Sequence, residues 1–363
     1  MNADARHMAH ALALGRRGLG RTWPNPSVGC VIVKDGRIIG RGVTAIGGRP
    51  HAEPQALEMA GKAAKGATAY VTLEPCAHTG QTPPCVDALI AAGIARVVIA
   101  LSDPDPRTDG AGAARLRAAG IEVTTGILEA EARADQQGFL TKITQQRPML
   151  TLKLATSFDG RIATATGQSQ WITDAPARRL THAMRATHDA VLIGGGTARA
   201  DDPMLNVRGL GITHQPTRIV MSRKLDLPLS SKLAASAKDI PLWICHAKDA
   251  DPNLITAWQG IGATLIEVPS NAARQLDPTA TMRALAARGL TRIFCEGGGA
   301  LAASLLQADL VDHLAGFTAG LALGAEGIPA ISALGLDQLS QATRFELQET
   351  RSIGPDVYHR WSR

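Results

Sequence analysis

The sequence between residues 51 and 85 reads His51-Ala52-Glu53, then Pro75-Cys76 and finally Pro83-Pro84-Cys85. One imidazole and two thiolates are ligands that zinc accepts at tetrahedral corners, and three such ligands leave the fourth corner for water. A helix is expected to begin near residues 52–54, and a strand is expected to end just before Pro75. The segment therefore predicts an α/β fold that brings a metal site together at strand-to-helix junctions.

Glu53 follows the histidine by two residues and is the candidate proton carrier of this site. A carboxylate there can take a proton from zinc-held water and pass it to a leaving amine without binding the metal. This layout is that of a zinc deaminase. The usual signature has two residues between the cysteines, whereas here eight residues, 77–84, separate them. We expect this loop to cover the site and to shape the choice of substrate.

Other interpretations of the same residues are less favoured. A structural zinc would have four protein ligands, and His78 could be the fourth, but Glu53 would then have no role. We expect His78 to face the substrate instead. Two further alternatives are a zinc-stabilised binding protein without activity and a nucleic-acid-editing deaminase with an accessory binding domain. The second would need a basic groove and stacking aromatics, and aromatic residues are only 3% of the chain.

Length and composition indicate a protein of two domains. The chain has 363 residues, and single cores stop growing at about 250–300 residues. The net charge of +6 is spread along the chain, which favours phosphorylated metabolites over nucleic acid as partners. No stretch approaches the roughly 18–20 apolar residues of a membrane span, and the N-terminus lacks the pattern of a signal peptide. We therefore expect a cytoplasmic protein that binds neither membranes nor nucleic acid.

The polar segment 145–148, which ends in a proline, is the best candidate for a domain boundary. We place a zinc-dependent deaminase domain at residues 1–146 and a second domain at 147–363. Both halves alternate expected strands and helices, which is typical of α/β domains. In the first half we expect helices at 5–18, 85–92, 112–119 and 129–140 and strands at 28–33, 38–43, 69–73, 96–101 and 121–125. In the second half we expect strands at 149–155, 189–193, 217–221, 242–245, 264–268 and 291–295, helices from 174 to 187 and at 299–307, and a final pair of strands around 354–356.

Two glycine runs in the second half, 194–196 and 297–299, each follow an expected strand and could hold the phosphates of a dinucleotide. Alone, each run could equally be a tight turn. Gly297, Gly299 and Ala302 fit the Rossmann fingerprint, but no acidic residue lies about 20 positions further on at the end of the next strand, so a Rossmann domain is less favoured. Lys153 lies on an expected strand. It could stabilise developing charge on a substrate or be an edge-strand lysine kept for solubility.

The chain resembles a known family, the bifunctional riboflavin-biosynthesis deaminase/reductases. The resemblance spans nearly the whole chain. In the first half it lies in the segments Pro24-Asn25-Pro26-Ser27-Val28-Gly29-Cys30, His51-Ala52-Glu53 and Thr72-Leu73-Glu74-Pro75-Cys76 with the loop that leads to Cys85. In the second half it lies in Lys153-Leu154-Ala155-Thr156-Ser157-Phe158-Asp159-Gly160, Ser169-Gln170-Trp171-Ile172 and Asp201-Asp202-Pro203-Met204-Leu205-Asn206-Val207-Arg208.

The resemblance implies a fold and two reactions. The first domain would have the three-layer cytidine-deaminase fold and would remove an amine from a diaminopyrimidinone that carries ribose 5-phosphate. The second would resemble dihydrofolate reductase and would use NADPH to reduce the ribosyl group to ribityl. The cofactors would be zinc and NADPH, the substrate a phosphorylated pyrimidine, and we expect the protein to be a homo-oligomer.

The candidate site residues come partly from the motifs themselves and partly from the resemblance. From the motifs, the zinc ligands would be His51, Cys76 and Cys85, and the catalytic residues Glu53 and Lys153. From the resemblance, cofactor contacts would fall on Ala155, Trp171, Thr197, Asp201, Ser222, Gly298, Gly299, Ala300, Leu301, Ala302, Ala303 and Ser304. Substrate contacts would fall on Asn25, His78, Ser169, Arg185, Leu205, Arg208 and Glu296. The chain departs from the family at Ala77, which is usually Ser, and at Gln81, which is usually Arg. Both departures lie in the loop that we expect to contact the substrate.

Overall fold

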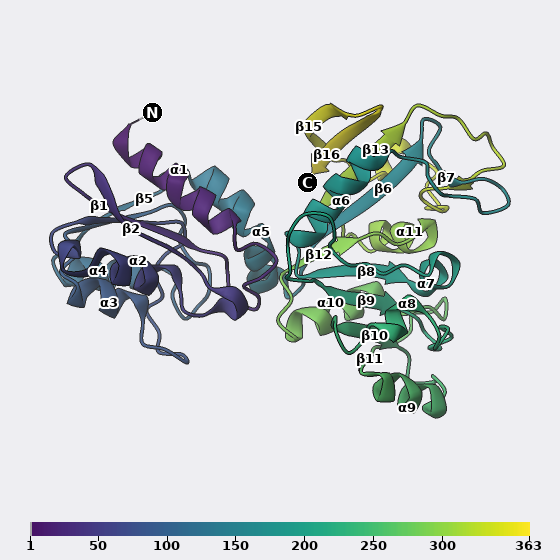
Figure 1. Cartoon of the computed structure of the whole chain (residues 1–363), viewed down its shortest axis with the longest axis horizontal. Helices are drawn as coiled ribbons and strands as arrows, with labels where there is room; N and C mark the ends of the chain where they lie inside the picture. The colour runs from purple at the N-terminus through teal and green to yellow at the C-terminus, as the bar shows by residue number, and fades with distance from the viewer. Residues whose placement is uncertain (1) are drawn as a thin grey trace. The chain divides into compact units, whose positions relative to one another are not determined.

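The structure is a computed structural model that describes residues 2–363, and it consists of two compact units (Figure 1). The chain passes from the first unit to the second between Arg147 and Pro148, one residue beyond the expected position. Over the described residues, no helix has both the length and the apolar content needed to cross a bilayer.

The first unit is built on a five-stranded sheet with the order β2-β1-β3-β4-β5. β1 runs antiparallel to both its neighbours, and β3, β4 and β5 are parallel. The strands are β1 (Gly29–Lys34), β2 (Arg37–Val43), β3 (Thr68–Val71), β4 (Arg96–Ile99) and β5 (Glu122–Thr125). The helices are α1 (Ala3–Arg16), α2 (Ala52–Ala60), α3 (Cys85–Ala91), α4 (Ala111–Ala118) and α5 (Glu129–Gln145).

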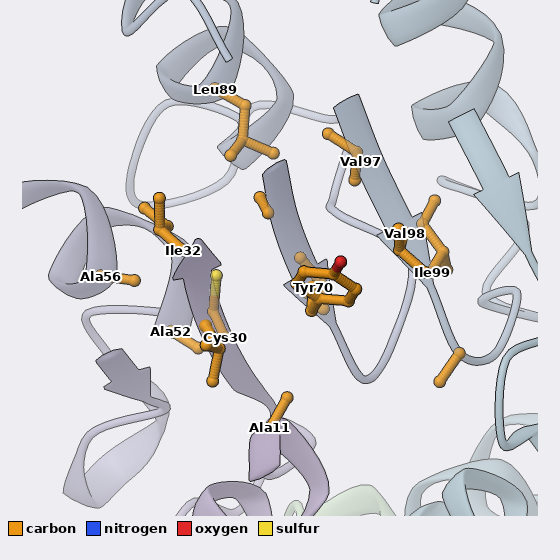
Figure 2. Close-up of a cluster of buried hydrophobic side chains, with 14 of the residues drawn as sticks. Ala11, Cys30, Ile32, Ala52, Ala56, Tyr70, Leu89, Val97, Val98 and Ile99 are labelled. Carbon is orange, nitrogen blue, oxygen red and sulfur yellow. The ribbon is translucent and has the colours of Figure 1, made fainter. Parts of the chain in front are cut away.

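Helices cover both faces of this sheet, which gives the three layers expected from the sequence (Figure 1). α1 packs against α5 and against β1, whereas α2 packs against β2 and α3. Figure 2 shows the core between these layers. Cys30 and Ile32 of β1 lie beside Ala52 and Ala56 of α2, and the cysteine is fully buried.

Two glycines of β2 bring α2 very close to the sheet. A Cβ at Gly42 would lie 1.9 Å from the carbonyl oxygen of Ala52, and a Cβ at Gly40 would lie 2.2 Å from that of Ala56. Only glycine allows this approach, because real Cβ atoms do not come so near to a backbone oxygen. The first turn of α2, which follows His51, is therefore fixed against β2 by direct backbone contact.

The second unit contains a nine-stranded sheet with the order β11-β10-β9-β8-β12-β6-β13-β16-β15. The strands from β11 to β13 are parallel, and β16 and β15 are antiparallel. The strands are β6 (Met149–Ser157), β8 (Ala190–Gly194), β9 (Thr217–Met221), β10 (Leu242–His246), β11 (Thr264–Glu267), β12 (Arg292–Cys295), β13 (His313–Ala319), β15 (Glu346–Ile353) and β16 (Asp356–Ser362). β7 (Arg161–Ala163) and β14 (Ile328–Pro329) form a separate pair, and the helices are α6 (Ala175–Ala186), α7 (Gly195–Asp201), α8 (Lys232–Ala235), α9 (Pro252–Ile261), α10 (Pro278–Ala287) and α11 (Gly299–Gln307).

The strand order reverses between β8 and β12. From β8 the chain proceeds outward through β9, β10 and β11, and it then returns to place β12 on the other side of β8. Open parallel sheets bind ligands at such a switch point, beyond the carboxyl ends of the strands. Both glycine runs follow these two strands, so they lie at this edge.

Lys153 lies in the interior of the sheet. It is on β6, which pairs with β12 on one side and with β13 on the other. The edge-strand interpretation of this lysine is therefore wrong. A charged residue on an interior strand needs another reason, and its neighbours in the cavity described below supply one.

Candidate active sites

The sequence-predicted zinc ligands lie together in the first unit. The ligand atoms of His51, Cys76 and Cys85 are all within 4.8 Å of one another. His51 Nδ1 is 3.3 Å from Cys85 Sγ and 3.7 Å from Cys76 Sγ. The histidine precedes α2, Cys76 lies five residues after β3, and Cys85 is the first residue of α3. The expected strand-to-helix junctions thus converge on one point.

Hydrogen bonds among the three side chains stabilise a negatively charged thiolate, which suits a bound cation. The hydrogen bond from Cys85 lowers the pKa of Cys76 to about 4, and the same contact raises the pKa of Cys85. The hydrogen bond to Cys76 raises the pKa of His51. One thiolate thus forms even without a metal, and its negative charge is held by neighbouring protons that a zinc ion would replace.

Glu53 lies against this cluster and is only 3% exposed. Burial raises the pKa of its carboxyl group, and the charge of His51 opposes the rise. Over the described residues no lysine or arginine forms an ion pair with it. A buried carboxylate is costly unless a positive charge compensates it. Three soft or borderline ligands beside a buried carboxylate that no lysine or arginine neutralises therefore fit a bound divalent zinc ion.

Asn25 and His78, the two expected substrate contacts of this unit, lie around the cluster. The Asn25 side chain donates to the Gly48 carbonyl at 2.8 Å and lies 3.5 Å from His51 Nε2. His78 Nδ1 is 3.4 Å from Thr108 Oγ1, and His78 is absent from the group that could hold a metal. The structure does not make His78 a fourth ligand.

Two buried acidic residues that the sequence interpretation missed support Cys76 and its loop. Glu74 accepts hydrogen bonds from the backbone N–H groups of Asp103, Gly110 and Ala113, at 3.2, 3.2 and 3.0 Å. Asp103 in turn accepts from the Asp105 N–H at 2.9 Å. The only local signal was Glu74 beside Pro75-Cys76, because its partners lie 29 to 39 residues away.

We expect the Asp103→Asn variant to gain stability relative to the wild type as the pH rises from about 4 to 6. Burial raises the pKa of Asp103 to about 6, well above the 3.8 of an exposed aspartate. A carboxyl group with a raised pKa holds its proton in the folded state, so ionisation above pH 4 destabilises the fold. The asparagine keeps the acceptor for the Asp105 N–H and does not ionise. The measurement is urea unfolding of both proteins at several pH values, and parallel pH curves would contradict the assignment.

The second unit has a cavity of about 1000 Å³ at its switch point. It is lined by the residues that follow β8 and β12, by part of β6 and by the segments 167–173 and 200–208. The expected residues that line it are Lys153, Ala155, Ser169, Trp171, Arg185, Thr197, Asp201, Leu205, Arg208, Glu296, Gly298, Gly299, Ala300 and Leu301. Ser222 and the later residues of α11, Ala302, Ala303 and Ser304, do not line it.

A charged cluster lies in the wall of this cavity. Glu296 accepts from Arg185 Nε at 2.5 Å and from Arg185 Nη2 at 3.1 Å, and Lys153 Nζ is 3.9 Å from the same carboxylate. Burial works to raise the pKa of Glu296, but the charges of Arg185 and Lys153 outweigh it and hold the pKa below its usual range. Burial lowers the pKa of Lys153. Arg185 is thus a largely buried ion-pair partner and not a solvated surface residue.

The two helices that begin at the glycine runs contact each other at the cavity. Thr197, in the first turn of α7, accepts a hydrogen bond from the Gly298 N–H at 3.0 Å, and Gly298 is the N-cap of α11. A Cβ at Gly299 would lie 2.7 Å from the Pro329 carbonyl, so this position requires a residue without a side chain. The beginnings of two helices therefore lie side by side at the switch point, where backbone N–H groups suit phosphate.

Comparison with known proteins identifies both halves. Residues 1–101 match the family model of the cytidine and deoxycytidylate deaminase zinc-binding region, and residues 148–359 match that of the RibD C-terminal domain. Among curated relatives, the riboflavin biosynthesis protein RibD of Escherichia coli is 42% identical over 98% of both chains. The protein of the same name from Aquifex aeolicus is 38% identical and covers 98% of this chain and 97% of its own.

Solved structures agree over the whole length. RibD of Acinetobacter baumannii superposes with a TM-score of 0.89 at 37% identity and covers 99% of this chain and 98% of its own. A Thermotoga maritima protein has a TM-score of 0.86 at 34% identity, with the same coverage. That protein is described as a diaminohydroxyphosphoribosylaminopyrimidine deaminase/5-amino-6-(5-phosphoribosylamino)uracil reductase.

Proposed function

Because this chain belongs to the RibD family of bifunctional riboflavin-biosynthesis deaminase/reductases, we propose that its two units carry out successive reactions on one phosphorylated pyrimidine. The first unit, which ends at Arg147, removes an amine from the diaminopyrimidinone ribotide. The second unit, which begins at Pro148, reduces the ribosyl side chain of the product with NADPH. The observation that carries the proposal is the convergence of His51, Cys76 and Cys85 beside the buried Glu53.

In the deaminase site the protein binds, orients and moves protons. His51, Cys76 and Cys85 would hold zinc, which would supply a water of lowered pKa. The Glu53 carboxylate would take a proton from the attacking water and deliver it to the departing amine. Asn25, which precedes β1, and His78, in the loop between Cys76 and Cys85, would orient the pyrimidine. This set of roles is a proposal, supported by the contacts of Asn25 with His51 and of His78 with Thr108.

In the reductase cavity the protein positions two ligands and stabilises charge. NADPH supplies the hydride, and its phosphates would lie on Thr197 and the N-terminal residues of α11. Lys153 would face the reacting sugar and stabilise negative charge that develops on its oxygen. Glu296 holds this ammonium and Arg185 in place. Arg208 has no carboxylate partner within residues 2–363 and donates to Asn206 at 3.1 Å, so it is a cation available for the substrate phosphate.

A second cavity supports NADPH over NADH as the cofactor. It measures about 680 Å³, lies beyond the carboxyl ends of β9, β10 and β11, and is lined by the cations Arg223, Lys224, Lys248 and Arg274 with only two acidic residues. Parallel strands are about 4.8 Å apart, so it lies a few strand widths from the switch point along the same edge. Ser222, an expected cofactor contact, precedes Arg223 and packs against Gly195 of α7. We infer that this basic cavity receives the 2′-phosphate of the cofactor.

We expect the double variant Lys224→Ala/Lys248→Ala to bind 2′,5′-ADP at least about tenfold more weakly, because two charge-assisted contacts to phosphate are lost. Binding of 5′-AMP should change little. Calorimetric titration of the zinc-loaded protein measures both ligands, with Arg283→Ala, an exposed cation of α10, as the control. Equal weakening for both ligands would show that the cavity does not recognise the 2′-phosphate.

The proposed function is tested on the purified full-length protein. Zinc per chain is counted by metal analysis, and ammonia release and NADPH oxidation are assayed separately on the ribotide and on its deaminated product. We expect one zinc per chain and both activities. A zinc-loaded protein that releases no ammonia from the ribotide would refute the proposal for the first unit. A protein that does not oxidise NADPH with the deaminated product would refute the proposal for the second unit.

A further inference from the structure

The loop Ala77–Pro84 that adjoins the zinc ligands has no lysine or arginine of its own. Position 81 is Gln, where the family usually has Arg. The proposed substrate nevertheless carries a phosphate with up to two negative charges. A phosphate in a binding site is usually held by lysine or arginine, most tightly by the paired N–H groups of a guanidinium. A cation from outside the loop therefore has to hold it, if the proposed deamination is correct.

Among the described residues, Arg49 and Arg115 contact this loop directly, and Arg107 precedes Thr108, which contacts His78 of the loop. Two of these three arginines are already neutralised. Arg107 donates from Nε and Nη2 to the carboxylate of Asp105. Arg115 donates to the Ala77 carbonyl at 2.7 Å and forms an ion pair with Asp87. Each of these guanidinium groups is held by a carboxylate, whose negative charge offsets its own and weakens its attraction for a phosphate.

Arg49 is the third, and its surroundings differ. Its Nη1 donates to the hydroxyl group of Thr82, a neutral acceptor in the loop. Its Nη2 lies 3.2 Å from the position that a Cβ at Gly80 would take, so the guanidinium lies beside residues 80–82. Within residues 2–363, no carboxylate forms an ion pair with Arg49. Since guanidinium has five N–H donors, most of them stay available for another acceptor.

The backbone around Arg49 belongs to the wall of the zinc site. Gly48 accepts the hydrogen bond of Asn25, and Asn25 also lies 3.5 Å from the ring of His51. Arg49 thus starts from the segment that carries a zinc ligand and reaches across to the loop that contains Gln81. A half-buried guanidinium spans the two segments that flank the site.

We propose that Arg49 binds the 5′-phosphate of the deaminase substrate and replaces the cation that the chain lacks at position 81. Thr82 holds the guanidinium near the loop, and the phosphate takes the remaining N–H donors. The assignment deepens the proposed function and depends on it. It also explains how the loop can carry glutamine at position 81 without loss of phosphate recognition.

The test compares ammonia release from the ribotide and from the same compound without its 5′-phosphate, using zinc-loaded full-length protein. In Arg49→Ala we expect the KM for the ribotide to rise about 10- to 100-fold, because a charge-assisted contact is lost. The kcat should stay nearly unchanged. The kcat/KM for the dephosphorylated compound should stay within about twofold of the wild type. Arg49→Lys should lose less, and Gln81→Arg added to Arg49→Ala should restore much of the KM.

The controls separate this proposal from a structural effect. Arg41→Ala removes an exposed cation of β2 and should change neither substrate. Zinc content and NADPH oxidation report whether Arg49→Ala has folded. The assignment would be overturned if Arg49→Ala lost kcat/KM equally on both substrates or lost none. It would also be overturned if Arg107→Ala, and not Arg49→Ala, showed the phosphate-selective loss. Wild-type protein that is inactive on the ribotide would refute the proposed deamination itself.

Discussion

The Glu53→Gln variant is expected to keep its zinc and to lose ammonia release by at least about 10²- to 10⁴-fold, the usual contribution of a positioned proton carrier. The substituted amide fills the same buried space beside His51, Cys76 and Cys85 but cannot accept and deliver a proton. The ligands are untouched, so metal analysis should still find one zinc per chain. Ammonia release is measured on the ribotide.

Two comparisons make the Glu53 result specific. Glu58→Gln changes an exposed carboxylate on the same helix, α2, and should behave as the wild type. NADPH oxidation on the deaminated product should stay unchanged in both variants, because the reductase residues lie in the second unit. Unimpaired ammonia release in Glu53→Gln would refute the role assigned to this residue.

The Glu296→Ala variant is expected to destabilise the second unit by about 3–5 kcal/mol and to abolish reduction. Removing one partner of a buried ion pair leaves the other charge uncompensated, which is costly. Here two cations, Arg185 and Lys153, would lose their shared carboxylate, whose side chain is 10% exposed. Urea unfolding, followed by hydrogen exchange in peptides of β6 and β12, reports this unit separately from the first.

Glu346→Ala, an exposed position on β15, is the matched control for Glu296→Ala and should change the unfolding free energy by less than about 0.5 kcal/mol. Glu296→Gln keeps the shape and the hydrogen-bond acceptor and should fall between the two. A change below about 1 kcal/mol in Glu296→Ala would mean that water screens the cluster.

Local patterns predicted most elements of the fold, and the exceptions have identifiable causes. The strand Thr217–Met221 and the helix Gly299–Gln307 were predicted with their observed bounds, because an apolar run and a glycine-led apolar helix are strong signals. β13 was missed, since Gly316 interrupts its pattern. A Cβ there would lie 2.0 Å from the ring of His359 on β16. A side chain that is distant in the sequence therefore requires glycine at position 316.

Two missed helices did have a local signal. α9 and α10 each begin with Asp-Pro, and the side chains of Asp251 and Asp277 accept from the backbone N–H groups of Asn253 and Ala280. An aspartate cap followed by proline in the first turn is a typical helix start. These helices could have been predicted from the sequence.

The two sites differ in how much of each could be predicted from the sequence. The zinc ligands were predictable because the chemistry requires particular residue types at short spacing. The rest depends on contacts between residues from 29 to 111 positions apart. These are the hydrogen bonds of Glu74, the pairing of Arg185 with Glu296 and the contact of Arg49 with the loop. No local pattern encodes such contacts. The family membership also sets aside the nucleic-acid-editing and non-enzymatic alternatives.

The glycine contacts beneath α2 have a consequence for how this chain can change over time. Alanine at position 42 would push against the Ala52 carbonyl and displace the start of the helix, together with the imidazole that precedes it. Real Cβ atoms stay at least 3.0 Å from such atoms, so the 1.9 Å contact would move the start of the helix by roughly 1 Å, which is large for a tetrahedral ligand set. Sequence drift at Gly40 and Gly42 should therefore weaken zinc affinity together with the packing of α2.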